Sequence, residues 1–431
     1  MESIIKQDIV KYFLEKNLFS NKQHGFISGR STTTQLLKFI DHCLQVYATG
    51  GAMDVVYLDF AKAFDTVPHR RLIAKLRAHG ISGPVLNWIK SFLKGRKQCV
   101  RVNGTLSDPA YVLSGIPQGS VLGPILFVIY INDLPNEIAS DVLLFADDTK
   151  IFRCIRSIPD SLYLQNDLQK LVDWSNRWLL KFNADKCHVL TLGKHENIIH
   201  AHNYRMDGIE LEHVFEEKDL GVIVDSNLSF DEHITTKVKK ANAMAGMIRR
   251  SFTYLESNFF KKLYVTFVRP HLEINNSVWA PYLRKHVNAI EKVQMRAAKC
   301  VDGFNDLSYE EQLRKLDLPT LAHRRKRGDM IEIFKHAKVY DKASLSTSIR
   351  FRNRPSRKHD FQITRLEASD GVRGPQRNSF YYRTAATWNE LPKSVVNSSS
   401  VTAFKKQIDE FWKDEPTKFI FDAKPYHHLE E

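Results

Sequence analysis

The N-terminal half of the chain alternates between helical hydrophobic spacing and short apolar runs typical of strands. Ile5, Ile9, Phe13 and Leu14 fall on one side of a helix, and Ser31 is suited to cap the start of another. The same criteria predict helices over 4–18, 31–48, 68–76, 84–94, 121–134 and 160–181, and strands over 53–59, 187–193 and 219–225. Residues 142–152 are predicted as a strand, a turn and a second strand.

Later segments refine this pattern. QCVRVNGTLSDPAYVLSG is predicted as a hairpin with Asn103 and Gly104 in its turn. The helix over 121–134 is almost entirely apolar, which indicates that it is buried. From about residue 229 the pattern is helical, with helices predicted over 229–250, 257–268, 287–301 and 400–413. Residues 342–378 are basic and rich in Ser and Pro, which is typical of a linker or a flexible loop.

This order of elements predicts the fold class. Strands separated by helices up to about residue 192 favour an α/β (α+β) fold with one antiparallel-leaning sheet in a ferredoxin-like arrangement. In such a sheet the first strand lies beside the central hairpin. Segments far apart in the sequence therefore meet at one sheet edge.

Composition adds a class of partner. The 431 residues are enough for two or three domains, and Lys and Arg exceed Asp and Glu to give a formal charge of +14. That surplus suggests a polyanionic partner, nucleic acid first. The five cysteines are scattered without Cys/His metal spacing, which argues against a zinc site and fits a reducing compartment. No apolar run is long enough to span a bilayer, and no signal peptide is recognised.

The acidic pair in LLFADDTKIF carries the candidate chemistry. Asp147 and Asp148 follow one predicted strand, and Asp59 ends another, so the predicted sheet brings the three carboxylates to one edge. Converging carboxylates need a cation, and hard oxygen ligands suit Mg²⁺. Two such ions can clamp the attacking and leaving oxygens of a phosphoryl transfer. The local alternatives are that Asp148 is a turn residue and that Asp59 caps a backbone amide.

The motifs occur in an order that resembles the reverse transcriptases of non-LTR retrotransposons, the LINE-like elements of the jockey and chicken-repeat types. The resemblance rests on HGFISGRSTTTQL, YLDFAKAFDTV, SGIPQGSVLGPILF, LLFADDTKIF, WLLKFNADKCHVLTLG and KDLGVIVDSNLSFDEHI, and it continues over nearly the whole chain. It implies a right-hand polymerase with partial fingers, a ferredoxin-like palm, a helical thumb and a mostly helical C-terminal region. The implied boundaries are 1–195 for the reverse transcriptase domain, 196–305 for the palm end and thumb, and 306–431 for a C-terminal region of unknown role.

The resemblance also implies the activity. The expected reaction is RNA-directed DNA synthesis, with an RNA template, a DNA primer or target, dNTPs and two Mg²⁺ ions, for which Mn²⁺ could substitute. Asp59, Asp147 and Asp148 are the implied metal ligands, and the backbone carbonyl of Phe60 is an added ligand. Lys186 is placed near the pyrophosphate as a general acid and electrostatic clamp, or else it is an ordinary surface lysine.

Further residues are assigned to substrate binding. Phe64 is implied to block a nucleotide 2′-hydroxyl, or else it packs in the core. Gln118 can hydrogen-bond in the minor groove or to the incoming nucleotide, and Gly119 allows the backbone to approach the templating pair closely, although Pro117 and Gly119 also serve a turn before the next helix. Arg30 is expected to contact the triphosphate or template backbone, or to form a salt bridge at the helix start, and Asp65 is expected to cap the turn before Pro68.

Two basic runs are candidates for phosphate contacts. The thumb-side run comprises Lys237, Lys239, Lys240, Arg249 and Arg250. The second, Arg324–Arg327 in HRRKR, could instead be a nuclear-localisation-like patch, and each run could simply be a solvated face. Tyr381, Tyr382 and Trp388 are expected to pack in the core rather than to stack on bases.

The chain departs from the pattern of the family in its first finger block, whose Arg-Pro-Ile-Ser run has no counterpart here. An N-terminally truncated chain is the expectation, and neither an endonuclease domain nor an RNase H constellation is recognised. The alternative to an active polymerase is therefore an impaired remnant that only binds nucleic acid. A structural RNA-binding protein is a third interpretation, against which the intact acidic triad argues. The nucleus or the cytoplasm is the expected location.

Overall fold

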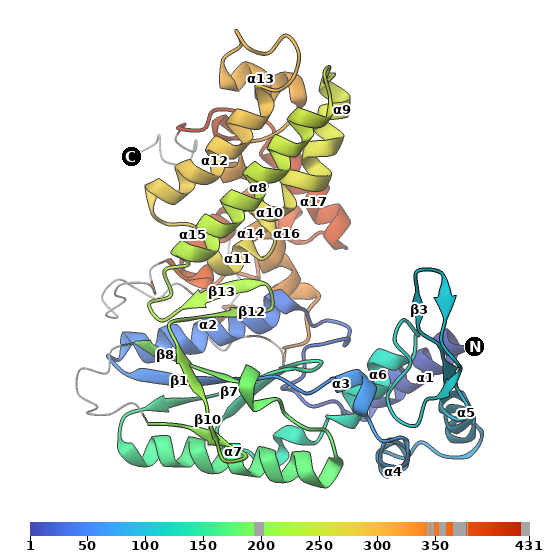
Figure 1. Cartoon of the computed structure of the whole chain (residues 1–431). Helices are drawn as coiled ribbons and strands as arrows, with labels where there is room; N and C mark the ends of the chain where they lie inside the picture. Colours follow the sequence, from blue (N-terminus) through green and yellow to red (C-terminus); the bar gives the residue numbers. More distant parts are fainter. Residues whose placement is uncertain are drawn as a thin grey trace. The chain divides into compact units, whose positions relative to one another are not determined.

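The computed structural model describes residues 1–193, 202–342, 345, 349–352, 359–364, 376 and 378–423. Contacts between residues divide the chain into two units (Figure 1). Unit 1 comprises Met1–Gln35 and Thr49–Phe215, and unit 2 comprises Leu36–Ala48 and Glu216–Glu431. Helix α2 (Thr32–Ala48) therefore begins in unit 1 and continues in unit 2. The boundaries that the resemblance implies remain a prediction.

A five-stranded sheet with the order β11-β8-β1-β7-β6 forms the centre of unit 1. Its strands are β1 (Ala52–Leu58), β6 (Asp141–Phe145), β7 (Asp148–Ile155), β8 (His188–Gly193) and β11 (Glu212–Val214). Strand β1 pairs antiparallel with both β7 and β8, β6 pairs antiparallel with β7, and only the short β11 is parallel to its neighbour. The predicted ferredoxin-like arrangement is confirmed, because β1 lies between β8 and the hairpin of β6 and β7.

Helices and short hairpins complete unit 1. The helices are α1 (Glu2–Glu15), α3 (Ala63–Thr66), α4 (His69–Ala78), α5 (Gly83–Leu93), α6 (Gly123–Tyr130) and α7 (Ile158–Trp178), with 3₁₀ turns η1 (Leu134–Glu137) and η2 (Ala184–Lys186). The short strands are β2 (Lys97–Gln98), β3 (Arg101–Val102), β4 (Thr105–Leu106), β5 (Ala110–Tyr111), β9 (Arg205–Met206) and β10 (Ile209–Glu210).

Most of these elements follow the hydrophobic pattern. Asn103 and Gly104 have positive φ and form the turn between β3 and β4, as predicted. The Ser31 hydroxyl accepts from the Thr34 amide at 3.1 Å, which confirms the predicted cap of α2. Leu14 is an exception, since its side chain is 44% exposed although it shares the apolar stripe of α1.

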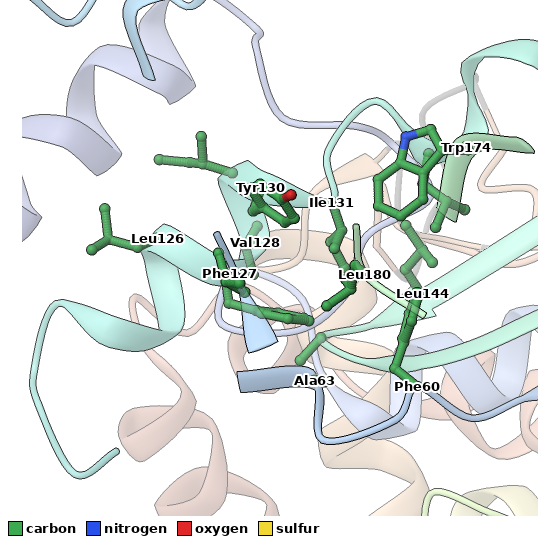
Figure 2. Close-up of a cluster of buried hydrophobic side chains, with 14 of the residues drawn as sticks. Phe60, Ala63, Leu126, Phe127, Val128, Tyr130, Ile131, Leu144, Trp174 and Leu180 are labelled. Atoms are coloured by element: carbon green, nitrogen blue, oxygen red, sulfur yellow. The ribbon is translucent and has the colours of Figure 1, made fainter. Parts of the chain in front are cut away.

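The core of unit 1 lies between the sheet and its helices. Every residue of α6 except Pro124 is buried, as its apolar sequence predicts. Helix α7 packs against β7 through the predicted stripe of Leu164, Leu168, Leu171 and Trp174. Figure 2 shows part of this core, where side chains beside β1, from β6, from α6 and from α7 meet. The candidate site is therefore carried on strands that are packed from behind.

Unit 2 is mainly helical, as predicted. It contains a hairpin, β12 (Glu216–Asp219) and β13 (Val222–Asp225), and helices α8 (Asp231–Ser251), α9 (Ser257–Leu263), α10 (Pro270–Glu273), α11 (Asn276–Trp279), α12 (Arg284–Ala298), α13 (Tyr309–Leu316), α14 (Leu321–Lys338), α15 (Phe380–Glu390), α16 (Lys393–Val396) and α17 (Val401–Phe411). A π-helical turn, η3 (Tyr264–Val268), joins α9 towards α10, and a 3₁₀ turn, η7 (Pro416–Lys418), follows α17. The prediction of one strand over 219–225 is wrong in detail, because Leu220 and Gly221 have positive φ and turn the chain between two strands.

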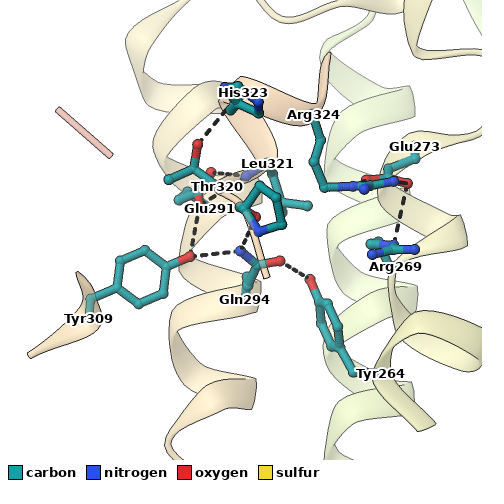
Figure 3. Close-up of polar contacts among 11 residues, drawn as sticks. Tyr264, Arg269, Glu273, Glu291, Gln294, Tyr309, Thr320, Leu321, His323 and Arg324 are labelled. Carbon is teal, nitrogen blue, oxygen red and sulfur yellow. Dashed lines mark hydrogen bonds and ion pairs between the residues drawn. The ribbon is translucent and has the colours of Figure 1, made fainter. Parts of the chain in front are cut away.

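Buried polar groups hold the helices of unit 2 together (Figure 3). Glu291 on α12 is fully buried and accepts from the Tyr309 hydroxyl at 2.7 Å and from the Leu321 amide at 3.1 Å. Gln294, one turn along α12, accepts from the Tyr264 hydroxyl at 2.8 Å. Such networks link α12 to α13, α14 and η3.

The basic segment predicted over 342–378 lies largely outside the described residues. Within the described part of the chain, no helix combines the length and apolarity needed to cross a bilayer. Mixed helix and sheet is thus the observed fold class.

Candidate active site

The acidic pair sits on the hairpin that joins β6 and β7. Phe145 and Asp148 form the last paired position of the two strands, so Ala146 and Asp147 make the turn itself. Ala146 has a φ of 54°, in the left-handed region that a residue with a Cβ rarely adopts. Asp148 begins β7 and is exposed, whereas Asp147 is half-buried. The two acids therefore occupy different environments, although they are adjacent in the sequence.

Asp59 lies next to this hairpin, as the predicted sheet requires. Leu58 is the last residue of β1 and pairs with Thr149 of β7, so Asp59 follows at the level of Asp148. Burial raises the pKa of Asp147, and the charge of Asp59 raises it further. The fold thus brings these carboxylates into electrostatic contact at one end of the sheet.

The described residues contain no group of three or more His, Cys, Asp or Glu side chains that could hold a metal ion as they stand. The donor set nevertheless suits Mg²⁺, because carboxylate oxygens on rigid strands are the ligands that this ion takes. The assignment of Asp59, Asp147 and Asp148 as metal ligands remains a prediction.

Lys186 reaches the same end of the sheet from η2. Its Nζ lies 4.0 Å from Asp59 Oδ2, and its side chain is 69% exposed. An exposed lysine beside a carboxylate can turn towards an anionic substrate without leaving a buried charge unpaired. This position is compatible with the predicted contact to the pyrophosphate.

Cys187 contacts the backbone of Asp59. The sequence did not indicate this contact. The Asp59 amide donates to Cys187 Sγ at 3.4 Å, and the thiol donates to the Asn183 carbonyl at 3.2 Å. Burial raises the pKa of this thiol to about 11, so it stays protonated near neutral pH. Its place directly after Lys186, in a motif already singled out, is the one signal that could have drawn attention to it.

The two phenylalanines near Asp59 are held by aromatic stacking. Phe60 stacks on Phe182 with ring centroids 4.4 Å apart, and the residues form an isolated bridge. Phe64 stacks on Phe127 at 4.4 Å but is only half-buried, which leaves part of its ring accessible. Core packing and a steric role at the sugar are thus both open to Phe64.

The loop before α6 docks onto α3. The Gly115 amide donates to the Val67 carbonyl at 2.8 Å, and Gln118 Nε2 donates to Asp65 Oδ1 at 2.9 Å. Gly119 is exposed with a φ of 77°, which suits glycine at that position. Asp65 therefore orients the exposed Gln118 amide, in addition to any effect on the turn before Pro68.

Arg30 hydrogen-bonds to the backbone of the loop that precedes α2. Its Nη1 donates to the Ser20 carbonyl at 2.6 Å and to the Gln23 carbonyl at 2.5 Å. The guanidinium therefore closes the loop before α2. Its predicted contact with nucleotide or template remains a prediction.

The two basic runs differ in environment. On α8, Lys239, Lys240, Arg249 and Arg250 are exposed, and Lys237 is half-buried. On α14, Arg324 makes a two-point contact with Glu273, Arg325 is buried, Lys326 lies 3.8 Å from Glu415, and Arg327 pairs with Asp409. The prediction of a solvated face is wrong for the second run, because Arg325 is buried and the other three side chains lie against acids of unit 2. Tyr381 and Trp388 are buried, which confirms core packing for these two aromatic residues.

Comparison with known proteins supports the order of these motifs. Residues 1–244, more than half of the chain, match the family model described as reverse transcriptase (RNA-dependent DNA polymerase). The chain is 31% identical over 299 residues to the RNA-directed DNA polymerase from mobile element jockey of Drosophila funebris, which covers 65% of this chain and 32% of that protein. It is 28% identical over 319 residues to the probable RNA-directed DNA polymerase from transposon BS of Drosophila melanogaster, covering 70% of this chain and 34% of that protein.

The chain spans about a third of the length of these curated relatives. Among solved structures, apo telomerase from Candida tropicalis is similar at a TM-score of 0.43 and 11% identity, over 76% of this chain and 54% of that chain.

Proposed function

The chain belongs to the reverse transcriptase (RNA-dependent DNA polymerase) family, and we propose that it is the polymerase of a non-LTR retrotransposon. In this proposal it extends the 3′-hydroxyl of a DNA primer with dNTPs on an RNA template. The observation that carries the proposal is the meeting of Asp59, the Asp147 hairpin and Lys186 at one end of the sheet.

Asp59, Asp147 and Asp148 would hold the divalent ions, Mg²⁺ first. When bound, such ions supply Lewis-acid activation of the primer hydroxyl and neutralise charge on the leaving pyrophosphate. The residues themselves contribute rigidity, because β1 and β7 are paired along their whole length up to Leu58 and Thr149. Preorganised ligands of this kind need little rearrangement during the reaction.

Lys186 acts on the anionic part of the substrate. With its Nζ 4.0 Å from Asp59 Oδ2, the exposed ammonium group can bind the triphosphate and donate a proton to the departing pyrophosphate oxygen. Its four-carbon stem allows the movement that this requires.

Phe64 of α3 and Gln118 of the loop before α6 would select the nucleotide. Phe64, fixed by its stack on Phe127, would place its ring under the sugar and leave no room for a 2′-hydroxyl. Gln118, oriented by Asp65, presents an amide to the base pair or nucleotide. Exposed lysines and arginines of α8 would contact phosphates of the duplex.

Primer extension on an RNA template tests the proposal. With Mg²⁺ and dNTPs, the wild-type chain is expected to extend a DNA primer, and Asp147→Asn is expected to be inactive while still binding the duplex. Equal inactivity of both proteins, with duplex binding retained, would instead identify a nucleic-acid-binding remnant. Nuclear or cytoplasmic location stays a prediction.

A further inference from the structure

Residues 22–24, in the connection between α1 and α2, extend the sheet beyond β6. The His24 amide donates to the Leu144 carbonyl at 2.7 Å, and the Leu144 amide donates to the Lys22 carbonyl at 2.9 Å. Gln23 and Leu144 therefore form a parallel bridge at the open edge of β6. This segment lies beside the strand that leads into the acidic hairpin.

The side chain of Gln23 continues from this bridge to the turn. Gln23 is fully buried, and its Oε1 accepts from the Ala146 amide at 2.9 Å and from the Gly25 amide at 2.7 Å. A buried amide oxygen shared by two backbone N–H groups fixes both of them. One of these groups belongs to the residue directly before Asp147.

The backbone of Ala146 has an unfavourable conformation within the turn. Its φ of 54° lies in the left-handed region, which is unfavourable for a residue with a Cβ. Ala146 is also buried, so its amide could not turn to water if Gln23 were lost. The direction in which Asp147 leaves the turn thus depends on a contact from outside the hairpin.

The backbones of Gly25 and Ala146 approach each other too closely for a side chain at position 25. A Cβ added to Gly25 would lie 2.4 Å from the Ala146 nitrogen and 3.0 Å from the Phe145 carbonyl carbon. Glycine at position 25 is therefore required for the two backbones to approach this closely.

The loop that carries Gln23 is itself anchored at several points. Arg30 donates to the carbonyls of Ser20 and Gln23. Asn132, just after α6, accepts from the Ser20 amide at 2.8 Å and donates to the Leu18 carbonyl at 2.7 Å. These contacts join the Gln23 backbone to the core that lies behind the sheet.

We propose that Gln23 is a positioning residue of the polymerase: its buried amide oxygen holds the turn at Ala146 in the conformation that presents Asp147 beside Asp59. The role rests on the proposed function, because presenting Asp147 matters only if the carboxylates bind the metal ions. Arg30 assists by holding the Gln23 backbone through its carbonyl. Gly25 assists because it has no Cβ that would collide with the Ala146 backbone.

Hydrogen exchange measures the clamp directly, without reference to activity. Gln23→Met removes the acceptor with little change in volume, so the Ala146 amide is expected to exchange roughly 10-fold faster. Gln23→Glu keeps an acceptor oxygen at the same place and is expected to preserve the protection. The readout is mass spectrometry of the full chain, on a fragment that covers residues 143–148.

Gln312→Met is the matched control. Gln312 is also fully buried, but its Nε2 donates to the Phe304 and Leu307 carbonyls within unit 2. The substitution removes the same chemical group from an equally buried site. It is expected to lower stability while leaving exchange at Ala146 unchanged.

Binding of Mn²⁺ to the full chain provides the second readout. Loss of a contact that orients ligands typically weakens metal binding 10–100-fold, so Gln23→Met is expected to raise the Mn²⁺ Kd roughly 10-fold. In primer extension, kcat is expected to fall while the KM for primer-template stays near the wild-type value. Gly25→Ala, which pushes on the Ala146 nitrogen, is expected to act in the same direction and serves if Gln23→Met does not fold.

The outcomes separate the positioning role of Gln23 from the proposed polymerase function. If Gln23→Met and Gly25→Ala leave Ala146 exchange and the Mn²⁺ Kd at wild-type values, as Gln312→Met does, Gln23 is a core residue only and the positioning role is overturned. If the wild type extends no primer but Gln23→Met still loosens the turn and the Mn²⁺ site, the polymerase function is overturned and the positioning role stands.

Discussion

Two acids, Asp329 in unit 2 and Asp147 in unit 1, have opposite kinds of neighbour. In unit 2, Asp329 is 7% exposed and accepts from Arg383 at 3.1 Å and 3.2 Å, which pairs its charge inside the protein. In unit 1, Asp147 lies beside Asp59, and its pKa is raised by burial and by that second negative charge. Asp329 thus has a cationic partner inside unit 2, whereas Asp147 in unit 1 has a second acid beside it.

The basic residues of α14 and α8 also differ in whether they have partners within the protein. The arginines and the lysine of α14 between positions 324 and 327 are occupied by acids or buried, whereas Lys239 and Lys240 of α8 are exposed. A run of positive charge in a sequence therefore does not identify a nucleic-acid surface. The exposed charges remain available for phosphate, and the paired charges stabilise a fold.

The largest expected effect is on catalysis. Asp147→Asn removes a ligand of the proposed metal site and should lower kcat for primer extension by about 10³-fold or more. It should leave the stability of the chain unchanged or slightly higher, because it removes repulsion from Asp59. Steady-state kinetics and thermal unfolding measure both.

Asp173→Asn is the control for that substitution. Asp173 is an exposed acid of α7 whose Oδ1 accepts from Gln169 at 3.1 Å. Activity of this variant should match the wild type. A loss of stability in Asp147→Asn, with kcat preserved, would mean that Asp147 is a structural acid and would remove the contrast between the two units.

Removal of the paired acid Asp329 in unit 2 should affect stability. Asp329→Ala leaves Arg383 without its buried partner and is expected to lower the free energy of unfolding by about 3–5 kcal/mol. Urea denaturation measures this value. Glu410→Ala, which breaks the exposed pair with Lys413, should change it by less than about 0.5 kcal/mol. Equal effects of the two variants would contradict a paired, buried acid as the stabilising element.

A smaller effect is expected from pH. Burial, together with the charges of Lys326 and Lys418, lowers the pKa of His323 from 6.5 to about 4 in the folded chain. The unfolded chain binds the proton first, so stability is expected to fall as the pH drops from 6.5 towards 4, by up to about 3 kcal/mol. His233, whose burial lowers its pKa to about 3, adds to the same trend.

Thermal unfolding between pH 7 and 4 tests this expectation. His323→Asn should lose stability overall but show a shallower decline over that range, since the titrating group is gone. An unchanged slope in this variant would show that other groups carry the acid sensitivity of unit 2.

The smallest effect concerns the exposed charges of α8. If Lys239 and Lys240 each contact a phosphate, Lys239→Ala/Lys240→Ala should reduce the slope of log K against log salt by about 2. Fluorescence anisotropy with an RNA–DNA duplex measures the slope. Lys406→Ala on α17, an exposed lysine outside both basic runs, should leave it unchanged. The same slope in all variants would place the duplex elsewhere.

Local chemistry was enough to predict the elements and the acids. Residue type and period along β1, α6 and α7 predicted which faces are buried, because apolar side chains share the period of the element that buries them. Asp59 and the Asp147–Asp148 pair were recognised for the same kind of reason, since acids at strand ends are visible in the sequence itself. The ferredoxin-like order then indicated that these strand ends meet.

Tertiary structure decided which groups touch. The Gln23 oxygen at the Ala146 amide, the Cys187 thiol at the Asp59 amide and the pairing of Arg324 with Glu273 all join residues distant in the sequence. Local pattern cannot predict such contacts, because they depend on how packed elements bring individual polar atoms within hydrogen-bonding distance. The sequence by itself determined the elements and the chemical type of the candidate site. Packing determined which side chains hold that site in place, and which charges remain free to act on another molecule.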